Sequence, residues 1–299
     1  MRAFVTGGHG FVGPHLLAHL NDSGDDVVAP HQDEVDLDDA DALKAAITAA
    51  RPDAIYHLAA LASVAESWAD PLRTFDVNAV GTLRVLEVAR HLDPVPRVLL
   101  IGSAEVYGTV TAADVPIRED LPLSPVTPYA ASKVAAEYVG MQYHAGFGVP
   151  VVRARSFNHV GPGQHGQFVV ADIARRIADA VRDGSTGALR LGNPTARRDF
   201  TDVRDVVRAY RLLVTDGVAG EAYNVCSGID VSIGDLVQRL LVISGADLSV
   251  EIDPALIRPV DVPVLVGDNA KLRAATGWVP NYSLDDTLRD VLAAFSNTR

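Results

Sequence analysis

The stretch that decides the fold is "AFVTGGHGFVG", residues 3–13. "AFVTG" (3–7) has the apolar run of a buried strand, and "HLLAHLNDSG" (15–24) has the spacing of a helix that ends at a glycine. Between them, Gly7, Gly10 and Gly13 repeat every three residues. Glycines let a backbone turn tightly and approach a pyrophosphate at a helix N-terminus. The motif therefore predicts a dinucleotide-binding loop, with a simple glycine-rich turn as the alternative.

The same alternation of strand and helix continues outward from this loop. Apolar runs predict strands at 26–30, 53–60, 97–108 (with an exit loop) and 149–158, and periodic segments predict helices at 39–51 and 75–92. Apolar strands that alternate with helices are typical of an α/β fold with a doubly wound parallel sheet.

The pattern loosens after this half. Helices are predicted at 170–184 and 232–245, among loops rich in proline and glycine, and 200–214 reads as a helix that returns to the sheet. We expect a Rossmann domain in residues 1–157, with 200–228 returning to it. We expect a smaller, interleaved C-terminal substrate domain in 158–199 and 229–299.

Composition excludes several classes of protein. The chain has 299 residues, a net charge of −12 and a single cysteine, Cys226. The acidic balance argues against nucleic-acid or anionic-membrane binding, and one cysteine allows no intrachain disulfide. No apolar run is long enough to span a bilayer, and "MRAFVTGGHG" lacks a signal-peptide core. We expect a cytoplasmic protein.

The residues that follow the second predicted strand bear on the cofactor. An acidic residue there would bind the ribose 2′-hydroxyl of NAD, and a basic one the 2′-phosphate of NADP. His31 does neither clearly, so both NAD and NADP stay open. Asp36 and Leu37 could border the adenine, although Asp36 could equally cap a helix. From the glycine loop, we expect contacts from Gly7, Gly10, Phe11, Val12 and Gly13.

A tyrosine and a lysine lie four residues apart in "YAASK" (129–133). On a helix, Tyr129 and Lys133 share a face, and a nearby ammonium would lower the pKa of a tyrosine. Tyr129 would then serve as a general acid or base. Ser103, at the end of a predicted strand, could hold a substrate oxygen beside it. His15 and His19 have metal-ligand spacing but no acidic residue between them, so we predict no metal site.

With these motifs together, the chain resembles the extended short-chain dehydrogenase/reductases that modify nucleotide sugars. The resemblance rests on "TGGHGFVG", "HLAA" (57–60), "VNAVGT" (77–82), "GSAEVYG" (102–108), "YAASK", "RRDFTDVRDVV" (197–207) and "YNVCSG" (223–228). It implies a catalytic set of Ser103, Tyr129 and Lys133. It also implies cofactor contacts at Leu58, Ala59, Ala60 and Asn78, and at Tyr129 and Lys133.

Within this superfamily, "SFNHVGPGQ" (156–164) and "RDFTDVRD" (198–205) are most similar to GDP-4-keto-6-deoxy-D-mannose reductases, which make GDP-D-rhamnose. The resemblance implies a GDP-sugar substrate, a slight preference for NADPH and a homodimer. It implies that Asn158, Arg198 and Arg258 hold the substrate diphosphate, which suits the geometry of arginine. Ser103 and Glu105 would face the sugar.

Related enzymes leave other reactions open. In GDP-mannose 4,6-dehydratases, which this chain also resembles, a glutamate at the position of Glu105 removes a proton, and the residue before it helps water to leave. Here that residue is Ala104, which has no proton to donate. This favours an NAD(P)H-dependent C4-keto reductase. The alternatives are a dehydratase, a nucleotide-sugar 4-epimerase or a non-catalytic dinucleotide sensor.

Overall fold

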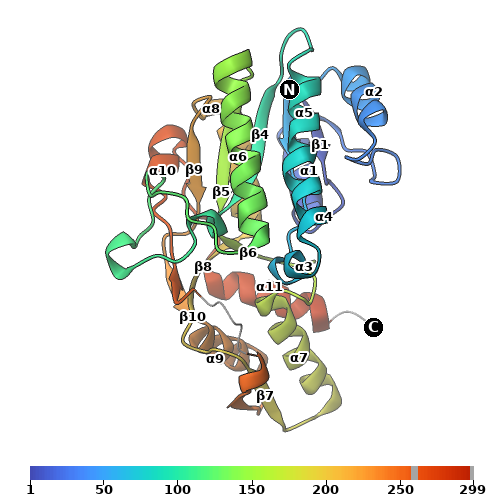
Figure 1. Ribbon diagram of the computed structural model, residues 1–299. Helices are drawn as coiled ribbons and strands as arrows, with labels where there is room; N and C mark the ends of the chain where they lie inside the picture. The colour runs from blue at the N-terminus through green and yellow to red at the C-terminus, as the bar shows by residue number, and fades with distance from the viewer. Residues whose placement is uncertain (257–261, 297–299) are drawn as a thin grey trace.

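A six-stranded parallel sheet forms the centre of the larger part of the molecule (Figure 1). The structure is a computed structural model and describes residues 1–256 and 262–296. The strand order is β2-β1-β3-β4-β5-β9. The strands are β1 (Arg2–Thr6), β2 (Asp26–Val28), β3 (Ala54–His57), β4 (Arg97–Ser103), β5 (Val151–Ser156) and β9 (Ala222–Val225).

Helices cover both faces of this sheet, as a doubly wound fold requires. On one face, α1 (Val12–Asp22) and α8 (Val203–Asp216) bury their apolar sides in a shared core with β1, β3 and β5. On the other face lie α2 (Ala40–Ala50), α5 (Gly81–Ala89) and α6 (Pro128–Phe147). Apart from the edge strand β2, the strands are largely buried on both sides, which explains why their sequences are apolar without alternation.

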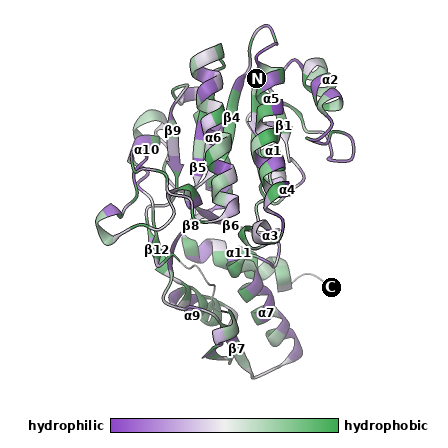
Figure 2. Ribbon diagram, viewed as in Figure 1, coloured by the Kyte–Doolittle hydropathy of each residue, from purple (hydrophilic) through white to green (hydrophobic). Residues whose placement is uncertain are grey.

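A smaller second part contains most of the elements that follow β5 (Figure 1). Its core joins α7, α9 and α11 to strands β7, β8 and β10. Figure 2 shows hydrophobic residues in β4 and α9 and both kinds of residue along α7. The elements are β6 (Asn158–Val160), α7 (Val169–Asp183), β7 (Ala188–Leu191), β8 (Arg197–Asp202), β10 (Asp230–Ser232), α9 (Ile233–Ser244), β11 (Ser249–Ile252), β12 (Val264–Leu265) and α11 (Leu284–Ser296). Helix α10 (Ala270–Thr276), expected in the second part, packs instead on α8 and β9 of the larger part, where Leu272 joins the core.

Three sequence expectations need correction. The helix expected at 200–214 begins only at Val203, because Phe200–Asp202 belong to β8 and Asp202 caps α8 by accepting from the Arg204 amide. The helix expected at 75–92 is interrupted by a π-helical turn at Asp76–Val80. The first helix begins at Val12, since Pro14 is tolerated within the first turn.

The strand order predicts where the large sheet binds a ligand. After β2 the chain crosses back, so that β1 lies between β2 and β3. Open α/β sheets bind ligands where the strand order reverses, at the carboxyl ends of the strands. Those ends are Thr6 of β1 and His57 of β3, which are paired in register. Among the described residues, no helix has the length and apolarity needed to cross a membrane.

Candidate active site

The glycine loop between β1 and α1 is packed too closely for other residues. Gly7 has a φ of 69°, and a Cβ there would lie 2.6 Å from the backbone nitrogen of Ala59. A Cβ on Gly13 would lie 2.1 Å from the carbonyl oxygen of Gly8. The loop therefore brings its backbone against the segment after β3, which includes the predicted contacts Leu58, Ala59 and Ala60.

The N-terminus of α1 fits an anionic group. The residue before this helix, Phe11, makes no side-chain cap, and the first turn contains no acidic residue. The first amides of a helix have no intrahelical acceptor, and together with the helix dipole they attract a phosphate. Phe11 and Val12 thus offer backbone donors at the place where a pyrophosphate would lie, whereas the Gly13 amide donates to the carbonyl of Gly10 at 3.1 Å.

A series of buried hydrogen bonds fixes the ends of β1 and β3 beside this loop. Thr6 Oγ1 is 2.8 Å from His57 Nδ1, and His57 Nε2 is 3.1 Å from Thr82 Oγ1. Thr82 in turn donates to the carbonyl of Asn78 at 2.7 Å. Burial lowers the pKa of His57 to about 3, so its imidazole is neutral and acts as a rigid link. This role of His57 was not predicted from the sequence, although the motif "HLAA" contains the residue.

Asn78 lies in the π-helical turn and is buried. Its side chain accepts from the Leu61 amide at 2.8 Å and donates to Ser132 Oγ at 2.9 Å. Ser132 donates to the carbonyl of Tyr129 at 2.7 Å. The extra residue of a π turn redirects a side chain and is frequent at functional sites. Here Asn78 connects the loop after β3 to the helix that contains Tyr129.

Tyr129, Ser103 and Glu105 meet at the carboxyl end of β4. A hydrogen bond joins the Tyr129 phenol to the Ser103 side chain, and the Ser103 hydroxyl also accepts from the Glu105 amide at 3.2 Å. Burial raises the pKa of Tyr129 to about 12, opposed by the Ser103 hydrogen bond and supported by the charge of Glu105. The sequence predicted a lowered pKa for Tyr129, and this is wrong for the protein alone, because desolvation by burial has the largest effect on the phenol.

Lys133 lies one turn further along α6. Its ammonium donates to the carbonyl of Ile101 at 2.9 Å and lies 5.9 Å from the centre of the Tyr129 ring. Burial lowers the pKa of Lys133 to about 8, so the group is still largely protonated at neutral pH. The neutral phenol of Tyr129 can therefore act as a proton donor, with the Lys133 ammonium close to its ring.

Helix α6 is held in place by a buried ion network. Glu137 accepts from Arg153 at 2.8 Å and from the Arg155 Nε at 3.1 Å, and all three side chains are buried. Arg155 also donates to the hydroxyl of Tyr107 at 2.9 Å, and Tyr107 donates to Asn224 at 2.7 Å. This network anchors the helix that contains the catalytic pair to β5 and β9.

The predicted adenosine contacts differ in their surroundings. His31 follows β2 and is half exposed. Asp36 accepts from the Asp38 amide at 2.9 Å, whereas the cap of α2 is Asp39. Leu37 is buried beneath Gly81, where it belongs to the core of the α2 and α5 face.

The predicted diphosphate contacts lie on the second sheet. Asn158 is in β6, paired with Phe200 of β8. Arg198 is in β8, where its guanidinium donates to the carbonyls of Arg197 at 2.9 Å and Val262 at 2.6 Å. Arg258 lies outside the described residues. Asp199 was not predicted from the sequence. It is buried and accepts from the amides of Ser227 and Gly228, and these hydrogen bonds fix the loop after β9.

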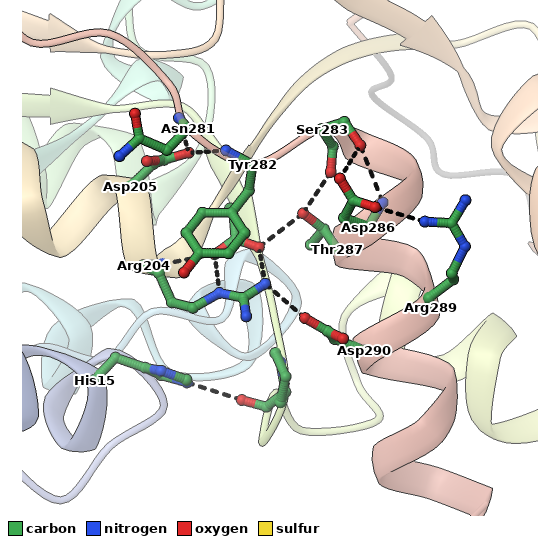
Figure 3. Close-up of polar contacts among 12 residues, drawn as sticks. His15, Arg204, Asp205, Asn281, Tyr282, Ser283, Asp286, Thr287, Arg289 and Asp290 are labelled. Atoms are coloured by element: carbon green, nitrogen blue, oxygen red, sulfur yellow. Dashed lines mark hydrogen bonds and ion pairs between the residues drawn. The ribbon is translucent and has the colours of Figure 1, made fainter.

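Polar contacts join the two parts of the molecule near α1, the helix that follows the glycine loop (Figure 3). His15 of α1 donates to the carbonyl of Pro162 at 2.9 Å. Arg204 pairs with buried Asp202 at 2.7 Å and with Asp290 of α11 at 2.8 Å, and it stacks on Tyr282 at 3.7 Å. These contacts fix the smaller part against the carboxyl edge of the sheet, where the candidate active site opens.

Comparison with known proteins agrees with this geometry. The family model described as GDP-mannose 4,6 dehydratase matches residues 29–291. The chain belongs to this family. It is 39% identical to the GDP-6-deoxy-D-mannose reductase of Pseudomonas aeruginosa, over 98% of this chain and 96% of that protein.

Two further relatives extend the comparison. The structure of RMD from Pseudomonas aeruginosa complexed with NADPH matches with a TM-score of 0.91, over 99% of this chain and 98% of the other. The UDP-glucose 4-epimerase of Mycolicibacterium smegmatis is 32% identical over 99% of both chains. The predicted Rossmann fold and the predicted resemblance to nucleotide-sugar enzymes are thereby confirmed.

Proposed function

We propose that the protein is an NAD(P)H-dependent reductase of the C4 keto group of GDP-4-keto-6-deoxy-D-mannose, with GDP-D-rhamnose as product. The observation that supports this most is full-length similarity to a GDP-6-deoxy-D-mannose reductase. It is combined with a Ser103–Tyr129–Lys133 set at the carboxyl edge of the sheet.

The residues suit this reaction. A reduced nicotinamide, when bound beside Ser103 and Tyr129, would supply the hydride for C4. Ser103 holds the C4 oxygen by a hydrogen bond, and Tyr129 gives its phenolic proton to that oxygen. Its raised pKa keeps Tyr129 protonated at neutral pH, the state that a reduction requires. Lys133 stabilises the negative charge that remains on Tyr129 after proton transfer.

One position separates reduction from dehydration. Ala104 follows Ser103 directly and is buried, so no side chain there can donate a proton to a departing 6-hydroxyl. Glu105 favours the second candidate function, a 4,6-dehydratase, because its charge acts on Tyr129 and it could serve as the base of an elimination. We favour the reductase because elimination would lack its acid.

The test is to mix purified protein with GDP-4-keto-6-deoxy-mannose and either NADH or NADPH, and to identify the sugar. Stoichiometric cofactor oxidation with a GDP-6-deoxyhexose product supports the reductase. Water loss from GDP-mannose without added cofactor, and no oxidation with the keto sugar, would instead establish the dehydratase.

The two parts of the chain then divide the binding between them. Residues 1–157, with 200–228 returning, would bind the dinucleotide, and 158–199 with 229–299 the sugar nucleotide. In support, β9 (Ala222–Val225) joins the six-stranded sheet beside β5. Asn158, Arg198 and Arg258 would bind the diphosphate from the second part. The single cysteine fits a cytoplasmic enzyme.

A homodimer is the assembly that we propose. Helices α4 (Pro71–Phe75) and α6 pack against each other, and exposed apolar side chains lie on this side of the sheet. They are Trp68, Leu72, Phe75, Leu83, Tyr138 and Met141. Of the small residues on α6, Ala130 and Ala136 are buried within the chain, whereas Ala131 faces outward. Exposed apolar patches of this kind are typical of interfaces.

A further inference from the structure

Two histidines meet at the adenosine end of the glycine loop. His9 lies in the loop after β1, and His31 lies three residues after β2 ends at Val28. Because β1 and β2 are parallel neighbours, with Phe4 opposite Val28, their carboxyl ends lie side by side. The centres of the two imidazole rings are 4.7 Å apart. In a dinucleotide-binding fold, this end of the second strand faces the ribose that has a 2′-hydroxyl in NAD and a 2′-phosphate in NADP.

The neighbours of each ring determine which nitrogen has the proton. His9 Nε2 is 3.3 Å from the carbonyl oxygen of Ala29, which can only accept. His31 Nδ1 is 3.4 Å from a carboxylate oxygen of Asp33, which also accepts when ionised. In each neutral ring, the engaged nitrogen therefore has the hydrogen, and the other nitrogen presents a lone pair.

Protonation reverses what the pair offers to a ligand. The structure shows no partner, among the residues it describes, for His9 Nδ1 or His31 Nε2. In the neutral state these two atoms are acceptors, which a phosphate oxygen avoids. In the protonated state both become N–H donors on a cation, and charge-assisted bonds to phosphate are the stronger kind.

We propose that His9 and His31 form a proton-dependent site for the 2′-phosphate of NADP(H), and that they determine which nicotinamide dinucleotide the enzyme prefers. This inference rests on the proposed cofactor class. The pair binds the phosphate when protonated, so NADPH is preferred at lower pH, and the preference declines with rising pH as the imidazoles lose their protons. An arginine at this position would instead give a preference independent of pH.

The charged groups around the pair are few in the part of the chain that the structure describes. Asp33 faces His31 Nδ1, and Glu34 accepts from the His31 backbone amide at 3.1 Å. Both carboxylates belong to the loop after β2 and are directed toward His31. Asp33 holds a proton on the imidazole nitrogen that the phosphate does not use, whereas Glu34 engages the backbone amide alone. The glycine loop contributes no charged group besides His9 itself.

The experiment measures binding, so that it does not depend on turnover. The affinities of NADPH, NADH and the fragments 2′,5′-ADP and 5′-AMP are measured by calorimetry from pH 6.0 to 8.5. The quantity of interest is the affinity ratio of each phosphorylated ligand to its partner. A phosphate monoester takes its second charge near pH 6, which changes this ratio by itself. The double variant His9→Gln/His31→Gln is measured with the same ligands, so the titration of the ligand phosphate affects its affinity ratio equally. Dividing the wild-type ratio by the double-variant ratio removes this contribution.

We expect the affinity ratio of the wild type, divided by that of the double variant, to fall at least about tenfold from pH 6.0 to 8.5. One proton linked to binding can change an affinity up to tenfold for each pH unit. His19→Gln, which removes a histidine of α1 away from the loop, should keep the wild-type profile.

The same ratio for wild type and double variant at every pH would overturn the proposal, as would a preference for NADH throughout. Unchanged 5′-AMP affinity in the double variant shows that the loop has kept its fold. A reductase assay that fails while this profile holds would contradict the proposed function alone.

Discussion

Tyr129 is buried beside Ser103, and its environment explains why a phenol is suited to reduction here. Burial raises the pKa of Tyr129 to about 12, and the Ser103 hydrogen bond opposes this only in part. A sequence shows that Tyr129 and Lys133 share a helix face, but it does not show how deeply that face is buried from solvent. The pairing was therefore predictable from spacing, whereas the direction of the pKa shift was not.

Replacement of Tyr129 tests its role as proton donor. In Tyr129→Phe we expect kcat to fall by at least about 100-fold, since general acid catalysis contributes 10²–10⁴-fold in enzymes. The affinity for the reduced dinucleotide should stay within about threefold of the wild type, because the glycine loop and α1 are unchanged. Steady-state kinetics and fluorescence titration measure the two quantities. A Tyr129→Phe enzyme with wild-type kcat would refute the role.

Lys133 predicts the pH dependence of the reaction. Its folded pKa is lowered to about 8 by burial, so the ammonium is present below pH 8 and is lost as pH rises through that value. We expect kcat/KM for reduction to decline above pH 8, while Tyr129, with its pKa raised, stays protonated over the same range. A pH–rate profile from 6 to 10 measures this.

A matched variant identifies the group that titrates. Lys133→Arg keeps its charge throughout this range, so its profile, at lower absolute activity, should stay level above pH 8. A wild-type profile that is level to pH 10, or a decline of equal size in Lys133→Arg, would show that another group is responsible.

At the scale of elements, α6 illustrates what a sequence conveys and what it leaves out. Thr127 accepts from the Ala130 amide at the start of the helix, Pro128 occupies its first turn, and Gly148 ends it with a φ of 72°. Such start and stop signals are local and could be read directly. The π turn that contains Asn78 could not be read, because its extra residue is stabilised by contacts with Leu61 and Ser132 that are remote in sequence.

The buried ion network of α6 predicts a large loss of stability on truncation. Glu137→Ala leaves Arg153 and Arg155 buried without a carboxylate, and breaking a buried pair costs about 3–5 kcal/mol. The matched control is Glu251→Ala, whose ion pair with Arg190 is 4.0 Å long and exposed, with an expected loss below about 1 kcal/mol. Urea unfolding measures both. Equal losses in the two variants would show that the network does not anchor the helix.

At the scale of the whole molecule, the parallel sheet and the glycine loop could be predicted, because apolar strand runs and glycine spacing are local signals. The arrangement of the second part could not. β8 receives partners from β6, β10 and β12, which are separated by long stretches of chain, and their short sequences have no distinctive periodicity. The same holds for the junction through Arg204, which depends on Asp290 of the final helix.

The proposed dimer predicts that a charge on the exposed apolar side separates the subunits. Leu72 is 83% exposed in the single chain, so Leu72→Glu should not disturb its fold. In a dimer that buries this side, the charge would be desolvated and would weaken association. Sedimentation velocity should show a dimer for the wild type and a shift toward monomer for Leu72→Glu. Val242→Glu, on an equally exposed residue of α9, is the control and should leave the wild-type mass unchanged.

In the proposed reduction, the hydride of the reduced cofactor is transferred to C4 of the sugar. This transfer is tested most directly with NADPH or NADH deuterated at C4 of the nicotinamide, GDP-4-keto-6-deoxy-mannose and purified protein, with the product examined by NMR and mass spectrometry. We expect one deuterium at C4 of a GDP-6-deoxyhexose for each cofactor oxidised. Recovery of unlabelled sugar and unoxidised cofactor, in a protein that converts GDP-mannose to the keto sugar, would contradict it.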